Sequence, residues 1–364
     1  MKILLTGGGT GGHVSPALGI ASEIMARSAE NELLFIGRRG GAENKAVEKM
    51  GIQLRELEVY GIKRSLSLSN LKRIFCAIKA IKEAKRIILD FSPDAVLGTG
   101  GYVCWPVLKA AKRLGIPTLI HESNEAPGLV TKLLSKKCNA VLVNCKTTAR
   151  YLKGAKRIET VGNPINPRFY AANKAMARHR LGIGSGNVLI LSFGGSGGAD
   201  IINRSAKELM RDYVAKENGV KHIHATGRAY FDEWVKDFDT PKNCRVMPYI
   251  ENMPEYLSAA DIVISRCGAM TLSELCAAGA CSILIPSPNV TGDHQKKNAL
   301  GFEEQGAAIM IEEKDLAKGA LIKTVDELVK NKERRLELSR RIGRKRTPDA
   351  ARKTVDIIEE LVGK

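Results

Sequence analysis

The chain has 364 residues, more than one hydrophobic core comfortably serves, so we expect two domains. With 44% hydrophobic and 26% charged residues, its composition is that of a soluble globular protein and excludes a fibrous or disordered chain. The net charge of +18 is concentrated in residues 1–163, which carry +13. This excess suits an anionic partner, and a solvated basic surface without a partner explains it equally well.

The sequence favours a cytosolic protein with reduced thiols. One long uncharged run, residues 275–292, is interrupted by Gly279, Pro286 and Pro288 and does not predict a membrane span. A predicted strand begins at residue 2, so we expect no signal peptide. None of the eight cysteines forms a Cys-x-x-Cys pair, and most lie in apolar runs, which is typical of free buried cysteine.

The first part of the chain alternates short apolar runs with amphipathic stretches. Strands are predicted at residues 2–6, 32–36, 95–97, 117–120 and 139–143. Such alternation favours a parallel sheet covered by helices on both faces. The first strand runs into a first glycine loop, residues 7–13, in which glycine amides and the start of a helix suit a phosphate.

A proline-rich segment, residues 161–167, reads as a linker, after which the alternation restarts. Strands are predicted at residues 188–193, 222–225, 245–247, 261–264, 282–285 and 307–311. A second glycine loop, residues 194–198, follows the first of them. The sequence therefore predicts an α/β fold of two doubly wound domains, 1–163 and 164–349, facing a central cleft. We expect a final helix, residues 350–362, to pack back on the first domain.

The first glycine loop also admits a cofactor interpretation. Gly7-x-Gly9-x-x-Gly12 fits the dinucleotide fingerprint, and Arg38 and Arg39 come directly after the end of the second predicted strand, where they would favour a 2′-phosphate. An NADP-dependent oxidoreductase is thus an alternative, although one cofactor does not need two glycine loops. His13 is either a surface residue or a general base. The second role is possible because a helix N-terminus favours the neutral imidazole, which can accept a proton.

Seven short motifs follow one another along the chain, at residues 8–16, 98–102, 121–124, 162–164, 194–199, 265–274 and 294–299. Together they resemble the MurG family of peptidoglycan glycosyltransferases, which move N-acetylglucosamine (GlcNAc) from its UDP donor to lipid I. The resemblance covers essentially the whole chain and implies a GT-B fold, with the acceptor on the first domain and the donor mainly on the second. It implies inverting transfer to the 4-hydroxyl of the N-acetylmuramic acid (MurNAc) unit, forming lipid II, without a cofactor or a metal.

The resemblance also implies roles for individual residues. Thr10, Gly11 and Gly12 would face the diphosphate and the sugar. The remaining substrate contacts would come from Asn124 (donor sugar), Ser196 (phosphate), Ile250 (uracil, through its backbone), Ala269, Met270, Thr271, Leu272 and Ser273 (under the nucleotide), Glu274 (ribose hydroxyls) and Gln295 (sugar). We expect His13 to be the catalytic base, with Glu122 as the second candidate.

Some positions depart from the family pattern. Asn166 stands where many members have an arginine that reaches the diphosphate, and Ser123 and Gly197 replace common glutamines. Asp237-Phe238-Asp239 spells the Asp-x-Asp metal signature of another glycosyltransferase fold, but it lies in a helix-to-turn context and reads as solvated acids. A UDP-GlcNAc epimerase, which can share this fold, remains an alternative activity.

Residues 60–90 suggest contact with a membrane surface. They carry eight basic residues against two acids, and a stripe at helical spacing comprises Leu71, Ile74, Phe75, Ile78 and Ile81. The stripe fits an ordinary core-facing helix, yet with Trp105 nearby we favour peripheral docking on anionic lipid at the cytoplasmic face of the cell membrane. RNA binding would explain the charge, but the chain lacks an aromatic-basic stacking motif, so we expect no nucleic-acid partner.

Overall fold

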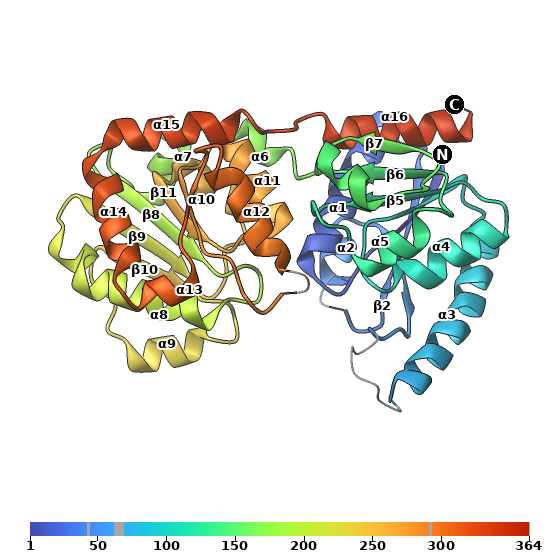
Figure 1. The fold of residues 1–364 in the computed structure, drawn as a ribbon, viewed down its shortest axis with the longest axis horizontal. Coiled ribbons are helices and arrows are strands. Elements are labelled where there is room, and N and C mark those ends of the chain that lie inside the picture. Colours follow the sequence, from blue (N-terminus) through green and yellow to red (C-terminus); the bar gives the residue numbers. More distant parts are fainter. Residues whose placement is uncertain (42–43, 62–68, 291–292, 364) are drawn as a thin grey trace. The chain divides into compact units, whose positions relative to one another are not determined.

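The computed structural model describes residues 1–41, 44–61, 69–290 and 293–363, and for residues 69–75 it describes the backbone alone. The chain forms two compact units, Met1–Asn166 with Thr347–Lys364, and Pro167–Arg346 (Figure 1). The last helix, α16 (Ala350–Val362), therefore belongs to the first unit, and the second unit is continuous in sequence.

The first unit is built on a seven-stranded sheet in the order β3-β2-β1-β4-β5-β6-β7, in which every pairing is parallel. Its strands are β1 (Lys2–Thr6), β2 (Glu32–Arg38), β3 (Gln53–Leu57), β4 (Ala95–Gly98), β5 (Thr118–Glu122), β6 (Ala140–Val143) and β7 (Ile158–Thr160). Its helices, besides α16, are α1 (Gly11–Arg27), α2 (Asn44–Lys49), α3 (Ser69–Phe91), α4 (Cys104–Arg113), α5 (Leu129–Leu134) and the 3₁₀ helix η1 (Lys146–Tyr151).

Alternate residues of β1 enter two separate cores, one on each face of this sheet. Leu4 packs with the buried residues of α3, α4 and α5, whereas Ile3 and Leu5 pack with those of α1 and α16. Helix α16 is further tied to α1 by Arg27, which donates hydrogen bonds to the carboxylates of Asp356 and Glu359, both at 2.6 Å. The chain's last helix is thus part of the first unit's core.

The second unit repeats the design with a six-stranded parallel sheet in the order β10-β9-β8-β11-β12-β13. Its strands are β8 (Val188–Phe193), β9 (Val220–Ala225), β10 (Cys244–Met247), β11 (Ile262–Ser265), β12 (Ser282–Leu284) and β13 (Ile309–Met310). Its helices are α6 (Arg168–Ala171), α7 (Lys174–Leu181), α8 (Asp200–Asp212), η2 (Val214–Lys216), α9 (Phe231–Asp237), α10 (Met253–Ala259), α11 (Ala269–Ala278), α12 (His294–Glu303), α13 (Glu313–Leu316), α14 (Ala320–Lys330) and α15 (Lys332–Gly343).

The predicted fold class, two doubly wound parallel sheets, is confirmed. In each sheet the strand order reverses at one central strand, β1 in the first unit and β8 in the second, and each glycine loop leaves that strand at its carboxyl end. Ligands of doubly wound sheets bind at this switch point. The sequence analysis did not predict β3 or β7, the two edge strands of the first sheet.

Candidate functional site

The first glycine loop packs against the loop that follows β4, which explains the glycines in both. The Gly8 amide donates to Gly100 O at 3.3 Å, and a Cβ on Gly101 would lie only 2.1 Å from Gly8 O. Gly101 also has a φ of +84°, a region that favours glycine. The motif at residues 98–102 therefore supports the first glycine loop.

His13 is the third residue of α1 and is held by this pair of loops. Its Nδ1 lies 3.1 Å from Gly8 O and 3.2 Å from Thr10 Oγ1, and its carbonyl accepts a hydrogen bond from Thr99 Oγ1 at 2.6 Å. A carbonyl oxygen only accepts, so Nδ1 carries the proton that faces Gly8 O. In the neutral imidazole the basic nitrogen is then Nε2. Residues 10–12 beside it are exposed.

Glu122, at the end of β5, is buried and holds the loop that carries Asn124. Its Oε1 accepts hydrogen bonds from the Asn124 backbone amide at 3.0 Å and from Asn124 Nδ2 at 3.1 Å. Its Oε2 accepts from the Gly128 amide at 2.9 Å and from Thr131 Oγ1 at 2.7 Å. A carboxylate that accepts four hydrogen bonds is better suited to positioning Asn124 than to taking up a proton.

The motif at residues 162–164 supports the same loop from beneath. His121 Nε2 donates to Gly162 O at 2.9 Å, and Asn163 Nδ2 donates to Ser123 O at 3.3 Å. Burial lowers the pKa of His121, so this imidazole is neutral and acts as a fixed hydrogen-bond donor. Both motifs thus organise the backbone around Asn124.

The second glycine loop connects β8 to α8 and leaves Ser196 exposed. The loop turns tightly, because the Gly198 amide donates to Gly195 O at 3.1 Å and a Cβ on Gly194 would lie 2.3 Å from the Ala199 nitrogen. Exposed backbone amides at the start of a thirteen-residue helix form a favourable site for phosphate.

A second loop of this unit follows β11 and leads into α11. Gln295 braces it, because its Oε1 accepts hydrogen bonds from the Ser287 amide at 2.9 Å and the Cys267 amide at 3.4 Å. Within the helix start, Met270 and Leu272 are buried, whereas Ala269, Thr271 and Ser273 are half-buried. The two buried side chains face the core, so a ligand above this turn would meet the other three and the backbone.

Glu274 is the sixth residue of α11 and lies beyond the first helical turn. Burial raises the pKa of its carboxyl to about 8, and no described residue donates a hydrogen bond or an ion pair to it. Burial raises the pKa of the Tyr249 hydroxyl, and the charges of Glu251 and Glu274 raise it further. Glu274 therefore lies near Tyr249, the residue before the buried Ile250. A half-buried carboxylate without a donor is a candidate ligand-binding group.

In each sheet the predicted site residues lie along the edge that the carboxyl ends of the strands form. In the first unit, residues 10–13 follow β1 and Asn124 follows β5. In the second, Ser196, Ile250, Glu274 and Gln295 lie beyond the carboxyl ends of β8, β10, β11 and β12. Parallel strands place these ends on the same side of the sheet. The sequence analysis did not assign roles to Thr99 and Thr131, which hold His13 and Glu122. Thr99 lies within the motif at residues 98–102.

The Asp-x-Asp segment lies away from this edge. Asp237 ends α9, and the Phe238 ring packs against Trp234 with ring centroids 5.4 Å apart. Among the residues that the structure describes, no group of three His, Cys, Asp or Glu side chains is arranged to hold a metal ion.

The basic, partly apolar stretch on α3 is only partly described. Ile81 lies in the first unit's core, while Ile78 is 51% exposed, and the side chains of Leu71, Ile74 and Phe75 lie outside the described residues, as do Lys63 and Arg64. Trp105 packs against the same core, with Lys109 Nζ 4.5 Å from its ring centroid. Within the described ranges, no helix is both long and apolar enough to cross a membrane.

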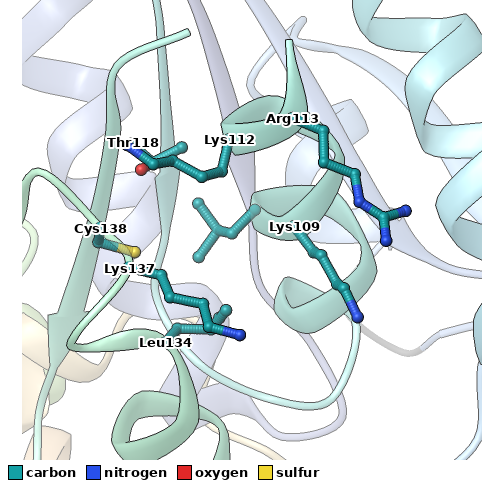
Figure 2. A pocket seen from close by; sticks show the side chains of 8 residues that line it. Lys109, Lys112, Arg113, Thr118, Leu134, Lys137 and Cys138 are labelled. Carbon is teal, nitrogen blue, oxygen red and sulfur yellow. The ribbon is translucent and has the colours of Figure 1, made fainter. Parts of the chain in front are cut away.

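A basic pocket lies between α4 and the end of α5 (Figure 2). Lys109, Lys112 and Arg113 of α4 line it together with Lys137 and the apolar Leu134. Two exposed leucines, Leu129 (69%) and Leu133 (52%), lie on α5. The pocket itself combines cations with the apolar side chains of Leu108 and Leu134.

Comparison with known families identifies both units. Residues 3–143 match the glycosyltransferase family 28 N-terminal domain, and residues 189–354 match the glycosyltransferase family 28 C-terminal domain. A Bacillus thuringiensis (strain Al Hakam) protein named UDP-N-acetylglucosamine--N-acetylmuramyl-(pentapeptide) pyrophosphoryl-undecaprenol N-acetylglucosamine transferase 2 is 40% identical over 100% of both chains. A transferase of the same name from Acetivibrio thermocellus is 38% identical over 100% of this chain and 98% of its own.

Solved structures agree with this assignment. The crystal structure of Acinetobacter baumannii MurG matches with a TM-score of 0.76 and 26% identity, covering 99% of each chain. A UDP-GlcNAc 2-epimerase from Neisseria meningitidis, bound to UDP-GlcNAc, matches with a TM-score of 0.68 over 99% of this chain and 100% of its own, but at 14% identity. That second likeness shows the shared fold alone. The fold is the GT-B fold that the family resemblance implied.

Proposed function

Because the chain belongs to glycosyltransferase family 28, we propose that it transfers GlcNAc from UDP-GlcNAc to the 4-hydroxyl of the MurNAc unit of lipid I, with inversion at C1, forming lipid II. The observation that carries this proposal is the 40% identity, over the full length of both chains, to a transferase named for this reaction. The glycine loops at the two switch points supply the phosphate-binding backbone that a UDP-sugar reaction needs.

The second unit binds the donor in this proposal. Glu274, without a donor of its own, accepts hydrogen bonds from the ribose hydroxyls, and Ile250 meets uracil through its backbone. The amides of the second glycine loop and Ser196 bind the diphosphate. Since the Oε1 of Gln295 already accepts two backbone amides, its Nε2 amide is the group that donates to the sugar.

The first unit supplies the base and the sugar contacts. Nε2 of His13 takes the proton of the attacking 4-hydroxyl, because the contact of Nδ1 with Gly8 O fixes the tautomer that leaves Nε2 basic. Thr10, Gly11 and Gly12 face the diphosphate and the sugar, and Glu122 positions Asn124 against the donor sugar. Negative charge on the departing UDP is stabilised by loop amides, Ser196 and the N-terminus of α8.

The acceptor determines the experiment that tests this function. With UDP-GlcNAc and a soluble lipid I analogue, we expect UDP release that depends on the analogue. A UDP-GlcNAc epimerase, the alternative of the same fold, would convert UDP-GlcNAc without any acceptor. The two family matches cover both glycine loops, and both are glycosyltransferase domains. They give no support to an NADP-dependent oxidoreductase.

We further propose that the protein docks peripherally on anionic lipid at the cytoplasmic face of the cell membrane, where lipid I presents its sugar. The charge of +13 on residues 1–163 supports this, together with the basic pocket and the exposed leucines of α5. The described part of the α3 stripe divides between core (Ile81) and surface (Ile78). Nucleic acid is not among the proposed partners.

A further inference from the structure

A buried hydrogen-bond network lies beneath the second glycine loop. Ser192 of β8 is opposite His224 of β9 in the strand register. Ser192 Oγ lies 2.7 Å from His222 Nε2 and 2.7 Å from His224 Nδ1. His224 Nε2 lies 3.1 Å from Asn203 Oδ1 on α8, and Asn203 Nδ2 donates to Thr226 O at 3.1 Å. All five residues are buried, so each of these polar groups depends on its partners.

The direction of every hydrogen bond in the network follows from Thr226 O, the acceptor at its end. Thr226 O can only accept, so the amide nitrogen of Asn203 faces it and Oδ1 faces His224. His224 therefore carries its proton on Nε2 and accepts the Ser192 hydroxyl proton at Nδ1. Ser192 Oγ in turn accepts a hydrogen bond from His222 Nε2. His222 Nδ1 is then unprotonated, and it is the ring nitrogen that has no hydrogen-bond partner.

The network reaches the glycine loop through Thr226. A Cβ on Gly198 would lie 2.2 Å from Thr226 O, and a Cβ on Gly227 would lie 2.6 Å from Gly198 Cα. The backbone of Gly198 thus rests directly on the carbonyl that Asn203 holds in place. At the other end of the loop, Ser192 lies two residues before Gly194. The network therefore connects the strand that enters the loop, the helix that leaves it and the turn on which it rests.

The network is uncharged, and an aromatic side chain packs against it. The His224 ring packs on Trp234 with centroids 4.8 Å apart. Burial lowers the pKa of His222 well below its usual range and that of His224 to about 3, so both rings are neutral across the physiological range. A neutral, fully directed network fixes geometry and has no proton to exchange with substrate.

We propose that Ser192, His224 and Asn203 are positioning residues that hold the amides of the second glycine loop in the geometry that binds the donor diphosphate. The inference rests on the proposed function, since it assigns UDP to this loop. Preorganised amides bind an anion without reorganisation, so a loop that loses this support loses donor affinity before the unit unfolds.

The full-length chain offers a matched pair of serines for the test. Ser192→Ala removes the hydroxyl that joins the two histidines. Ser282→Ala, on β12 of the same sheet, removes an equally buried hydroxyl whose hydrogen bond goes only to Ala280 O in its own loop. Ser192→Thr restores a hydroxyl at the first position. Affinity for UDP is measured by titration calorimetry, and the unfolding midpoint is measured for each variant.

We expect Ser192→Ala to weaken UDP binding roughly tenfold or more, because a small displacement of the loop amides costs affinity steeply. Ser282→Ala should lose about as much stability as Ser192→Ala but retain the wild-type affinity for UDP. Ser192→Thr should recover most of the UDP affinity that Ser192→Ala loses. Unchanged UDP affinity in folded Ser192→Ala, or an equal loss in Ser282→Ala, would overturn the positioning role alone. If the wild-type chain does not bind UDP, the proposed function fails and the inference fails with it.

Discussion

At the scale of single residues, the proposed reaction depends on the protonation of His13 and Glu274. The His13 ring is oriented by Gly8 O and Thr10 Oγ1, and its backbone is held by Thr99. The Glu122 carboxylate, the second candidate base, accepts three hydrogen bonds from the loop that follows β5 and a fourth from Thr131 of α5. This difference in geometry is why we assign proton transfer to His13 and positioning to Glu122.

Replacing His13 should therefore affect chemistry more than binding. We expect His13→Ala to lower kcat about 10²- to 10⁴-fold, the usual contribution of a general base, with UDP affinity nearly unchanged. His179→Ala, at an exposed histidine of α7, is the matched control and should leave kcat as it is. Turnover near the wild-type level with an unchanged pH profile would remove His13 from the mechanism.

The Glu274 carboxyl predicts how donor binding depends on pH. Burial raises its pKa to about 8, and ribose hydroxyls donate to the ionised form, so UDP affinity should rise as pH increases from about 6 to 8 and then level off. Binding at neutral pH should release protons, which calorimetry in buffers of different ionisation enthalpy detects. Glu274→Gln should bind more weakly and lose this pH dependence. An identical pH dependence in Glu274→Gln would contradict the assignment.

The same carboxyl has the opposite effect on the unliganded fold. Its pKa is higher in the folded chain than in the unfolded chain, so its contribution to stability is complete below the unfolded pKa of about 4.5 and is lost as pH rises through about 8. The site therefore keeps a group that stabilises the complex at the expense of the free protein near neutral pH.

At the scale of elements, loops of the first unit require glycine for two separable reasons. Gly101 combines a positive φ with direct contact against the Gly8 backbone, whereas Gly51 has a φ of +71° and nothing within 4 Å of a Cβ. Both residues lie in the first unit. The pair therefore separates backbone strain from overlap.

We expect Gly51→Ala to cost about 1 kcal/mol of the first unit's free energy of unfolding, the penalty for a left-handed residue. Gly101→Ala adds overlap with the Gly8 backbone and should cost about 3 kcal/mol or more. Denaturant titration of the full chain measures both. Equal costs would mean that the loop after β4 does not pack on the first glycine loop as the structure shows.

Most strands could be predicted because their apolar runs are long and buried on both faces. The edge strands β3 and β7 could not. β3 reads Gln-Leu-Arg-Glu-Leu and β7 has only three residues, so neither carries a continuous apolar signal. The motifs placed the candidate site residues in their loops, but they carried no information on the contacts of Thr99 with His13 or of Thr131 with Glu122, which the folded chain alone creates. The helical position and burial of Glu274 likewise required the structure.

At the scale of the whole molecule, the net positive charge is concentrated in residues 1–163, and the proposed membrane docking rests partly on this charge. Flotation with anionic vesicles at low salt should recruit the protein, and high salt should release it. Lys112→Glu with Lys137→Glu, in the basic pocket, should weaken recruitment roughly tenfold or more. Lys216→Glu with Lys242→Glu changes the net charge equally on the exposed surface of the second unit and should have little effect. Equal losses from both pairs would show a response to net charge alone.

The central claim is that one molecule combines a UDP-GlcNAc site with a lipid-linked sugar acceptor. Mass spectrometry of a lipid I analogue, incubated with the protein and UDP-GlcNAc, tests it most directly. The account predicts that the analogue gains one GlcNAc residue, with UDP formed in equal amount. An unmodified analogue, with UDP-GlcNAc converted to its C2 epimer whether or not the analogue is present, would contradict it.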